Sequence, residues 1–291
     1  MNKAFLELVL LAAIWGSSFL FMRVGAPEFG PILFMALRTS IAALFLYPLL
    51  VIKKQSNQLT GHWPKMMVLG ALNTAIPFAL FGFAILTLSA GVTSVLNATT
   101  PMFGALVAYF WLKDKLSITA VAGLLLGFIG VYFLMSDKLS QDSQAVLLPT
   151  LAVLGATLCY GISASFTKRY FSDVGALPLA TGSQVAASIL LVPIALFFLP
   201  ESIPSIKAIA SVGALGIVCT GVAYILFFRL IAALGPAKAI SVTYLIPVFG
   251  LCWGAIFLGE PITANIILGG LLILSGVGLT TGVIGRMGKK S

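Results

Sequence analysis

The chain has 291 residues, of which 60% are hydrophobic and only 9% are charged. A soluble domain has about a quarter of its residues charged, so this composition excludes a soluble globular protein. The formal net charge of +9 would by itself suit a nucleic-acid partner, but the positions of the charges along the chain decide that question.

Ten apolar segments follow one another along the chain, separated by short connections. A transmembrane helix needs about 20 mostly apolar residues, and each segment is close to that length. The first segment contains Glu7 and lacks a small-x-small cleavage site before Arg23, so we expect it to be retained rather than cleaved as a signal peptide. We therefore predict an all-α membrane protein with ten transmembrane helices, at about residues 5–22, 31–51, 66–88, 92–112, 118–135, 146–167, 177–199, 206–230, 237–258 and 264–284.

Lysine and arginine residues gather on one side of these predicted helices. With the amino terminus placed in the cytoplasm, thirteen of them fall on the cytoplasmic side and three (Arg23, Lys138 and Lys207) on the outer side, with Arg38 inside a helix. This is the positive-inside bias of membrane proteins. It predicts a multi-pass protein of the inner (cytoplasmic) membrane with both termini in the cytoplasm, and it explains the basic charge without a nucleic-acid partner.

Two matching segments lie half a chain apart. Pro101 begins an apolar run that ends in an acidic turn at Asp114, and Pro247 begins a similar run that ends at Glu260, at a fixed offset of 146. The match continues into the following helix, where two glycines of each copy correspond (Gly123 and Gly130 with Gly269 and Gly276). We predict a duplication, with one five-helix repeat at 1–140 and the second at 141–291.

The second repeat must enter the membrane from the opposite side, because five helices is an odd number. The opening helices of the repeats also correspond, with Trp15 matching Tyr160 and Arg23 matching Lys168 at an offset of 145. Inverted repeats predict a pseudo-twofold axis in the membrane plane and a central site between the halves. We expect Trp15 and Tyr160 to face each other across that axis.

Several segments resemble the drug/metabolite transporter superfamily, in particular its ten-helix EamA-type members. The resemblance covers nearly the whole chain and rests on Ile14–Phe19, Leu37-Arg38, Thr220–Tyr224 and the two proline-to-acid segments. The chain departs from that pattern with Asp114 in place of glutamate and with a shorter lead-in to Pro101. The resemblance implies a secondary transporter that works by alternating access, has no cofactor, and exports metabolites, with amino acids or related compounds the favoured class.

Uncharged polar and aromatic residues mark a candidate cavity. Any one of them alone is more simply explained by ordinary packing between helices. Together they favour a substrate site, because the family resemblance places the central pathway among the third, fourth, eighth and ninth helices. The predicted substrate-binding residues are Trp15, Asn73, Phe78, Asn97, Thr100, Tyr160, Tyr224 and Tyr244. Gating or structural roles are predicted for Pro77, Pro101 and Pro247, and kinks are expected at Pro101 and Pro247.

Arg38 is the only ionisable residue predicted deep inside a helix, roughly 10 Å below its outer end. It could bind a substrate carboxylate or phosphate, or act as a gate. Alternatively it has a structural role, capping backbone carbonyls or pairing with Glu28. We favour the gating or structural role, because the resembled family has an arginine here across many substrates.

Other functions fit the residues less well. Transport of phosphorylated or nucleotide-linked solutes would want two or more deep cations, and a cation pump would want a carboxylate near the midplane. A membrane-embedded enzyme would need a catalytic or metal constellation, which His62 and scattered loop carboxylates do not supply. We therefore predict no enzymatic activity and no metal, with a small-molecule substrate and the lipid bilayer as partners, in a monomer or homodimer.

Overall fold

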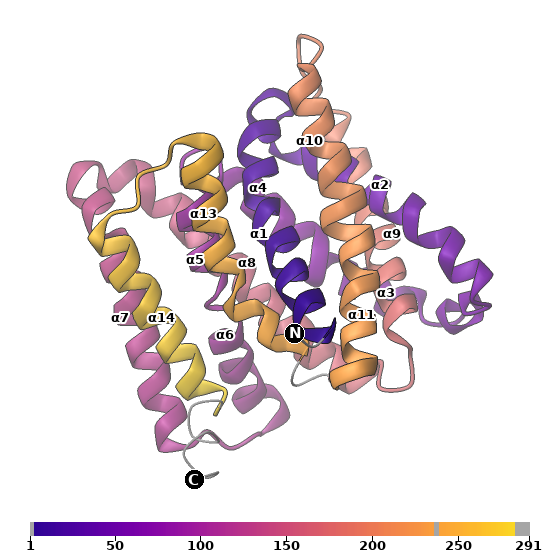
Figure 1. The fold of residues 1–291 in the computed structure, drawn as a ribbon. Helices are drawn as coiled ribbons and strands as arrows, with labels where there is room; N and C mark the ends of the chain where they lie inside the picture. Colours follow the sequence, from indigo (N-terminus) through magenta and orange to yellow (C-terminus); the bar gives the residue numbers. More distant parts are fainter. Residues whose placement is uncertain (1–2, 236–238, 283–291) are drawn as a thin grey trace.

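The computed structural model describes residues 3–235 and 239–282, without the side chains of residues 138–141, and it is helical throughout with no strand among these residues (Figure 1). Nine segments of this described part are long and apolar enough to cross a membrane, and a tenth apolar helix has 17 residues. The prediction of ten apolar helices is confirmed. The end of the tenth predicted helix, beyond residue 282, and the start of the ninth, at 237–238, lie outside the described residues.

Each half consists of five membrane segments, some of which contain more than one helix. The first half comprises α1 (Lys3–Phe29), α2 (Pro31–Ile52), the segment α3 (Trp63–Gly70), η2 (Ala71–Ala75) and α4 (Ile76–Ala84), the segment α5 (Ala90–Asn97), α6 (Thr100–Val107) and η3 (Ala108–Leu112), and α7 (Ile118–Gln141). The second half comprises α8 (Ser143–Tyr170), α9 (Ala176–Ala195), the segment α10 (Ile206–Gly216), η4 (Ile217–Val222) and α11 (Ala223–Leu234), the segment η5 (Ile240–Tyr244) and α13 (Ile246–Leu258), and α14 (Ala264–Thr280).

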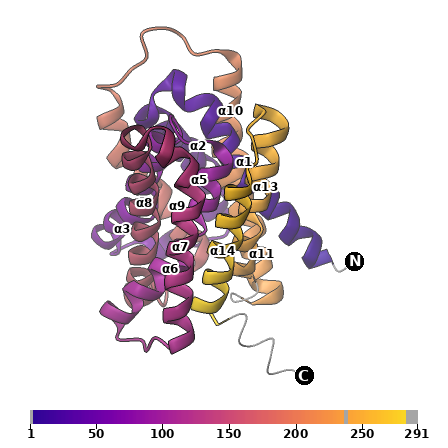
Figure 2. The ribbon, with the colours of Figure 1, turned by 90° about the vertical axis from the view of Figure 1, so that its left-hand side faces the viewer.

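The two halves are related by an inverted twofold repeat, and its contacts are clearest where α7 meets α14 (Figures 1 and 2). A Cβ atom on Gly123 would lie 2.6 Å from the carbonyl oxygen of Gly276, and one on Gly130 would lie 2.9 Å from that of Gly269. Exchanging the halves converts the first pair into the second, because Gly123 corresponds to Gly269 and Gly130 to Gly276. Glycine is needed here because the backbones themselves are in contact.

A second pair of close contacts follows the same symmetry. Gly16 of α1 packs against Phe249 and Gly250 of α13, and Gly161 of α8 packs against Phe103 and Gly104 of α6. The opening helix of each repeat, α1 or α8, therefore packs against the fourth membrane segment of the other repeat. These crossed contacts join the halves on both sides of the central axis.

Backbone irregularities also occur at corresponding places. The π-helical turns η2 and η4 begin at Ala71 and Ile217, which are 146 residues apart. Before each repeated proline the helix tightens: the amide of Thr99 bonds to Leu96, and that of Leu245 bonds to Val242. Such π turns and breaks interrupt the regular ladder of helical hydrogen bonds, and they are common near functional sites.

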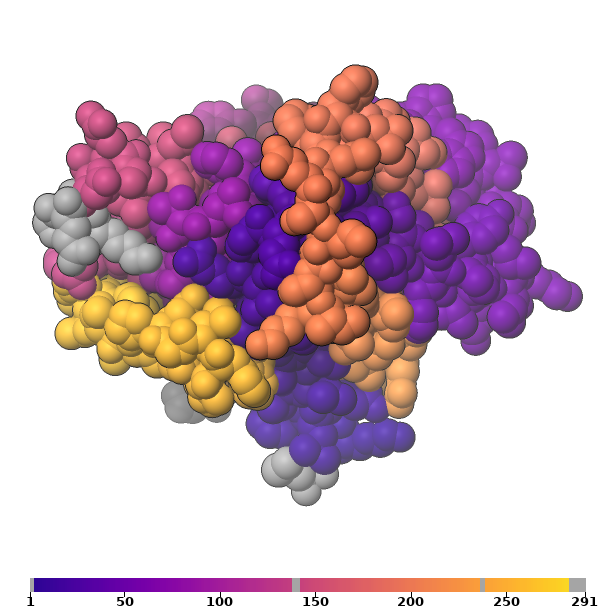
Figure 3. Space-filling model, turned by 90° about the horizontal axis from the view of Figure 1, so that it is seen from above, coloured from indigo at the N-terminus to yellow at the C-terminus, as the bar shows by residue number. Residues whose placement is uncertain are grey.

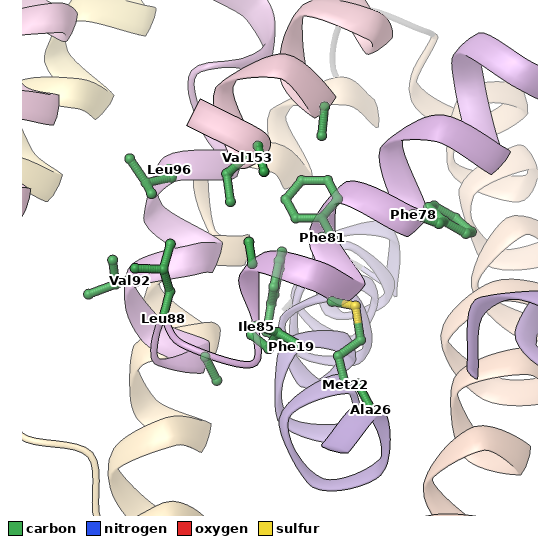
Figure 4. Packing of buried hydrophobic residues seen from close by; sticks show 14 of the residues in the cluster. Phe19, Met22, Ala26, Phe78, Phe81, Ile85, Leu88, Val92, Leu96 and Val153 are labelled. Atoms are coloured by element: carbon green, nitrogen blue, oxygen red, sulfur yellow. The ribbon is translucent and has the colours of Figure 1, made fainter. Parts of the chain in front are cut away.

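The central hydrophobic core lies where α1, α4, α5 and α8 meet. Figure 4 shows Phe19 and Phe81 within it, beside Ile85 and Val153, while Phe78 lies at its edge. Seen from above, the connection between α9 and α10 and the first turns of α10 lie over the middle of the molecule (Figure 3). The core thus fixes α4 in place, with Phe78 at its edge and in contact with Arg38 of α2.

Candidate functional site

Arg38 of α2 is buried, with 7% of its surface exposed, and it contacts both halves of the protein. Its guanidinium carbon lies 3.7 Å from the centre of the Phe78 ring of α4. Its Nε donates a hydrogen bond of 3.3 Å to Oγ1 of Thr220 in η4. An arginine over an aromatic face is attracted by the ring's quadrupole, and the attraction is stronger away from water.

The π turn η4 sets the direction of the Thr220 hydroxyl. This hydroxyl donates to the carbonyl oxygen of Leu215, five residues earlier, at 2.9 Å. Because its hydrogen is used in that bond, its lone pairs remain to accept from Arg38. The irregular turn therefore fixes an acceptor beside the guanidinium.

Two tyrosines and an asparagine complete the surroundings of Arg38. Tyr160 of α8 and Tyr224 of α11 are close enough to interact electrostatically with the guanidinium, and the Asn73 side chain lies beside the Tyr224 hydroxyl. Asn73 is held by a hydrogen bond of 2.8 Å from Ser163 Oγ to its Oδ1. Phe78 therefore contacts Arg38 directly, and three more of the eight predicted substrate-binding residues (Asn73, Tyr160 and Tyr224) lie in the same region.

Aromatic rings extend this site on two sides. Phe81 stacks on Tyr160 with ring centres 6.1 Å apart, and Phe19 meets Phe81 edge-on at 6.0 Å. On the other side Tyr224 stacks on Phe228 at 5.8 Å. The site is thus a single cation and several neutral polar groups set among flat apolar faces. Such a mixture suits a small amphipathic ligand.

The other predicted substrate-binding residues have different partners. The ring of Trp15 packs on Phe227 at 5.2 Å, so the expected meeting of Trp15 and Tyr160 is not among the described ring contacts. Thr100 Oγ1 donates to the Asn97 carbonyl at 2.8 Å, within the turn that precedes Pro101. Tyr244 bonds to Thr281 at the end of α14 at 2.7 Å. Thr220 belongs to the polar cluster that the sequence places in the candidate cavity, but it is not among the eight predicted substrate-binding residues.

Glu28 is not the partner of Arg38 that one interpretation of the sequence suggested. The Glu28 carboxylate accepts hydrogen bonds from the backbone amide and the hydroxyl of Ser205, at 2.6 and 2.8 Å. All eight carboxylates of the chain are within the described residues, and each lies in a loop or near a helix end. Arg38 is accordingly a buried cation without a protein carboxylate as partner among its described contacts.

The repeat does not reproduce this cation in the second half. A Cβ atom on Gly216 would meet Ile41 and the Arg38 carbonyl, whereas one on Gly70 would meet Ala186 and the Ser183 carbonyl. Gly70 and Gly216 correspond, so the counterpart of Arg38 is Ser183. Thr74, the counterpart of Thr220, is buried without a hydrogen-bond partner, and so is the amide of Gln184 beside Ser183.

The described residues contain no group of three or more histidine, cysteine or acidic side chains that could hold a metal ion. The site therefore contains hydrogen-bonding groups, one positive charge and aromatic faces. These groups can bind and orient a solute.

Comparison with known proteins identifies the family of this chain. The model of the EamA-like transporter family matches it twice, over residues 2–136 and 147–282. The "Uncharacterized transporter YoaV" of Bacillus subtilis is 28% identical over 98% of this chain and 99% of its own length. The "Probable terminal-alkyne amino-acid exporter" of Streptantibioticus cattleyicolor is 24% identical (95% and 93% covered), and the "Probable amino-acid metabolite efflux pump" of Escherichia coli is 25% identical (92% and 91% covered).

A solved structure supports the fold independently of these names. A chain described as "Crystal structure of protein" aligns with a TM-score of 0.68 over 98% of both chains, at 20% sequence identity. At this identity the likeness concerns the fold alone. It agrees with the ten-helix arrangement described above.

Proposed function

Because the chain belongs to the EamA-like transporter family, we propose that it exports a small organic metabolite, an amino acid or a related compound, across the cytoplasmic membrane. The observation that supports this best is the composition of the Arg38 site. Arg38 and Phe78 come from the first half, whereas Thr220 comes from the second. A solute bound there would touch both halves, as a carrier with inverted repeats requires.

Alternating access would follow from movement of the halves against each other. The π turns η2 and η4 and the breaks before Pro101 and Pro247 are the places where helices can bend with least loss of regular hydrogen bonds. Rigid-body rocking of paired repeats with bending at such points is an established type of transition.

The orientation and the direction of transport are part of the proposal. Both termini are assigned to the cytoplasm from the positive-inside bias, and the ion pairs of Arg229 with Glu7 and of Lys168 with Asp114 lie at ends assigned to that side. Export is proposed because two relatives are named as an exporter and an efflux pump. Phosphorylated solutes are less suitable, because Arg38 is the one charged side chain among the buried residues that the structure describes.

Exchange measurements in proteoliposomes test this proposal. The vesicles are loaded with an unlabelled amino-acid panel and mixed with labelled compounds, with and without an imposed pH gradient. We expect saturable counterflow of at least one compound, absent from empty liposomes. Counterflow only of amines, purines or sugars would overturn the substrate class, and flux that does not saturate would indicate a channel.

A further inference from the structure

We infer that Arg38 binds the free carboxylate of the transported molecule, and that the rings beside it hold a flat, apolar body. This inference rests on the proposed function, because it assigns the chemistry of a ligand to the same central site. The substrate class is a small monocarboxylate, an amino acid or keto acid with an apolar side chain. Molecules in which that carboxylate is absent or blocked should bind more weakly.

The orientation of the guanidinium leaves one edge free for a ligand. Phe78 covers one face, at 3.7 Å from its ring centre, and Nε donates to Thr220. The remaining edge has the two terminal nitrogens, and no protein acceptor is recorded for them among the described contacts. Two parallel N–H groups match the two oxygens of a carboxylate, which is the strongest arrangement arginine makes with an anion.

The charge of the site requires a counter-ion. Leaving a buried cation unpaired is costly, and within a membrane an arginine is typically paired or directed to a water-filled space. Six of the eight carboxylates of the chain have hydrogen bonds elsewhere, and the other two, Asp173 and Glu201, are exposed residues of loops. A bound carboxylate would supply the missing negative charge.

The repeat limits the ligand to one such group. On the opposite side, the counterpart of Arg38 is Ser183, and the Thr74 hydroxyl there has no partner. The Arg38 position is therefore cationic, whereas the corresponding position of the second repeat is neutral. A second carboxylate or a phosphate dianion would find no second cation, whereas an apolar or hydroxylated end would be accommodated.

The rings define the rest of the ligand. Phe81 stacked on Tyr160 forms one apolar face, and Tyr224 stacked on Phe228 forms another. Asn73 and the tyrosine hydroxyls are the neutral groups available to an amino or keto substituent. An organic cation would meet Arg38 with the same sign of charge and is disfavoured.

Ligand-induced thermal stabilisation of the purified wild-type protein tests this without any variant. Four compounds share a phenyl ring: phenylalanine, phenylpyruvate, phenylalaninamide and phenethylamine. A ligand that binds the folded state raises the melting temperature, and at equal concentration the rise is larger for the ligand that binds more tightly. We expect phenylalanine and phenylpyruvate to bind at least about tenfold more tightly than the amide or the amine.

Variants then assign the discrimination to Arg38. Arg38→Gln should weaken binding of phenylalanine by about tenfold or more and abolish its advantage over phenylalaninamide, and Arg38→Lys should retain part of it. Arg169→Gln, at an exposed arginine, is the matched control and should behave as wild type.

The outcomes separate this inference from the proposed function. Equal binding of phenylalanine and phenylalaninamide by the wild-type protein would overturn the inference, as would full discrimination in Arg38→Gln. Counterflow of phenethylamine without counterflow of phenylalanine would leave a working carrier but refute the carboxylate site. If folded protein exchanges no compound of any class, the proposed function itself fails.

Discussion

Phe78 lies with its ring centre 3.7 Å from the guanidinium carbon of Arg38, at a depth where an unpaired cation is costly. The ring therefore contributes to the stability of the protein as well as to the site. Phe78→Leu removes the cation–π attraction, which is about 2 kcal/mol when desolvated. We expect a lower melting temperature in detergent, whereas Phe78→Tyr should retain most of the stability.

Phe110→Leu is the control for this change, because Phe110 is 69% exposed and has no cation over its ring among the described contacts. Its melting temperature should stay close to that of the wild type. If Phe78→Leu and Phe110→Leu destabilise the protein equally, the contact of the Phe78 ring with Arg38 contributes little to stability.

The close contact of α7 and α14 predicts a large effect for a small substitution. A Cβ atom on Gly123 would lie 2.6 Å from a backbone oxygen and 2.7 Å from the Thr280 amide nitrogen. Backbone cannot move aside as a flexible side chain does, so Gly123→Ala should separate the two helices. We expect a loss of about 1–3 kcal/mol, typical of overpacking, measured as a fall in melting temperature and in folded yield by size-exclusion chromatography.

Gly213→Ala in α10 provides the matched control, since nothing lies within 4 Å of the added methyl group. Alanine is the better helix former, so this variant should be neutral or stabilised by up to about 1 kcal/mol. Equal behaviour of the two variants would show that the helices at the pseudo-twofold axis are not closely packed.

The glycines at this axis also show what the sequence could predict. The offset of 146 identified Gly123 and Gly276 as members of a repeat, and hydrophobicity identified the helices, because both signals are local or periodic. Ser183 was not named as the counterpart of Arg38, although the offset of 145 found for the opening helices leads from Arg38 to Ser183. The matching contacts of Gly70 and Gly216 support this correspondence, whereas the side chains that surround Arg38 are a property of packing.

The site shows the same division. Asn73, Phe78, Tyr160 and Tyr224 were predicted from residue type and family resemblance; Phe78 contacts Arg38, and the other three lie in the same region. Tyr244 was predicted for the same reasons but bonds to Thr281. Residue type indicates which side chains can bind a solute, whereas the rotation of each helix decides which of them face inward.

Glu260, in the loop after α13, connects the two halves by binding the amino-terminal end of α5. Its carboxylate accepts hydrogen bonds from the backbone amides of Ala90 and Gly91, at 2.7 and 2.9 Å. These are free amides of a helix amino terminus, where a carboxylate also interacts favourably with the helix dipole.

Glu260→Ala should lower the stability of the protein by about 1–2 kcal/mol, and Glu260→Gln, which retains one acceptor, by less. Thermal unfolding of the three proteins distinguishes these effects, and Glu201→Ala, at an exposed loop residue, serves as the control.

Gln184 and Gln58 should respond in opposite directions to the same substitution. Gln184 is fully buried, and neither its amide nitrogen nor its amide oxygen has a hydrogen-bond partner, whereas Gln58 accepts a bond of 2.8 Å from the Gly175 amide. An unsatisfied buried polar group costs about 1–3 kcal/mol, so Gln184→Met, with a side chain of similar length, should raise the melting temperature. Gln58→Met removes a satisfied hydrogen bond and should lower the melting temperature.

A fall in the melting temperature of both variants would mean that the Gln184 amide binds something in the folded protein, such as an internal water. The thermal measurement should therefore be repeated with phenylalanine present: if Gln184 touches the ligand, the stabilisation by phenylalanine will be smaller in Gln184→Met than in the wild type.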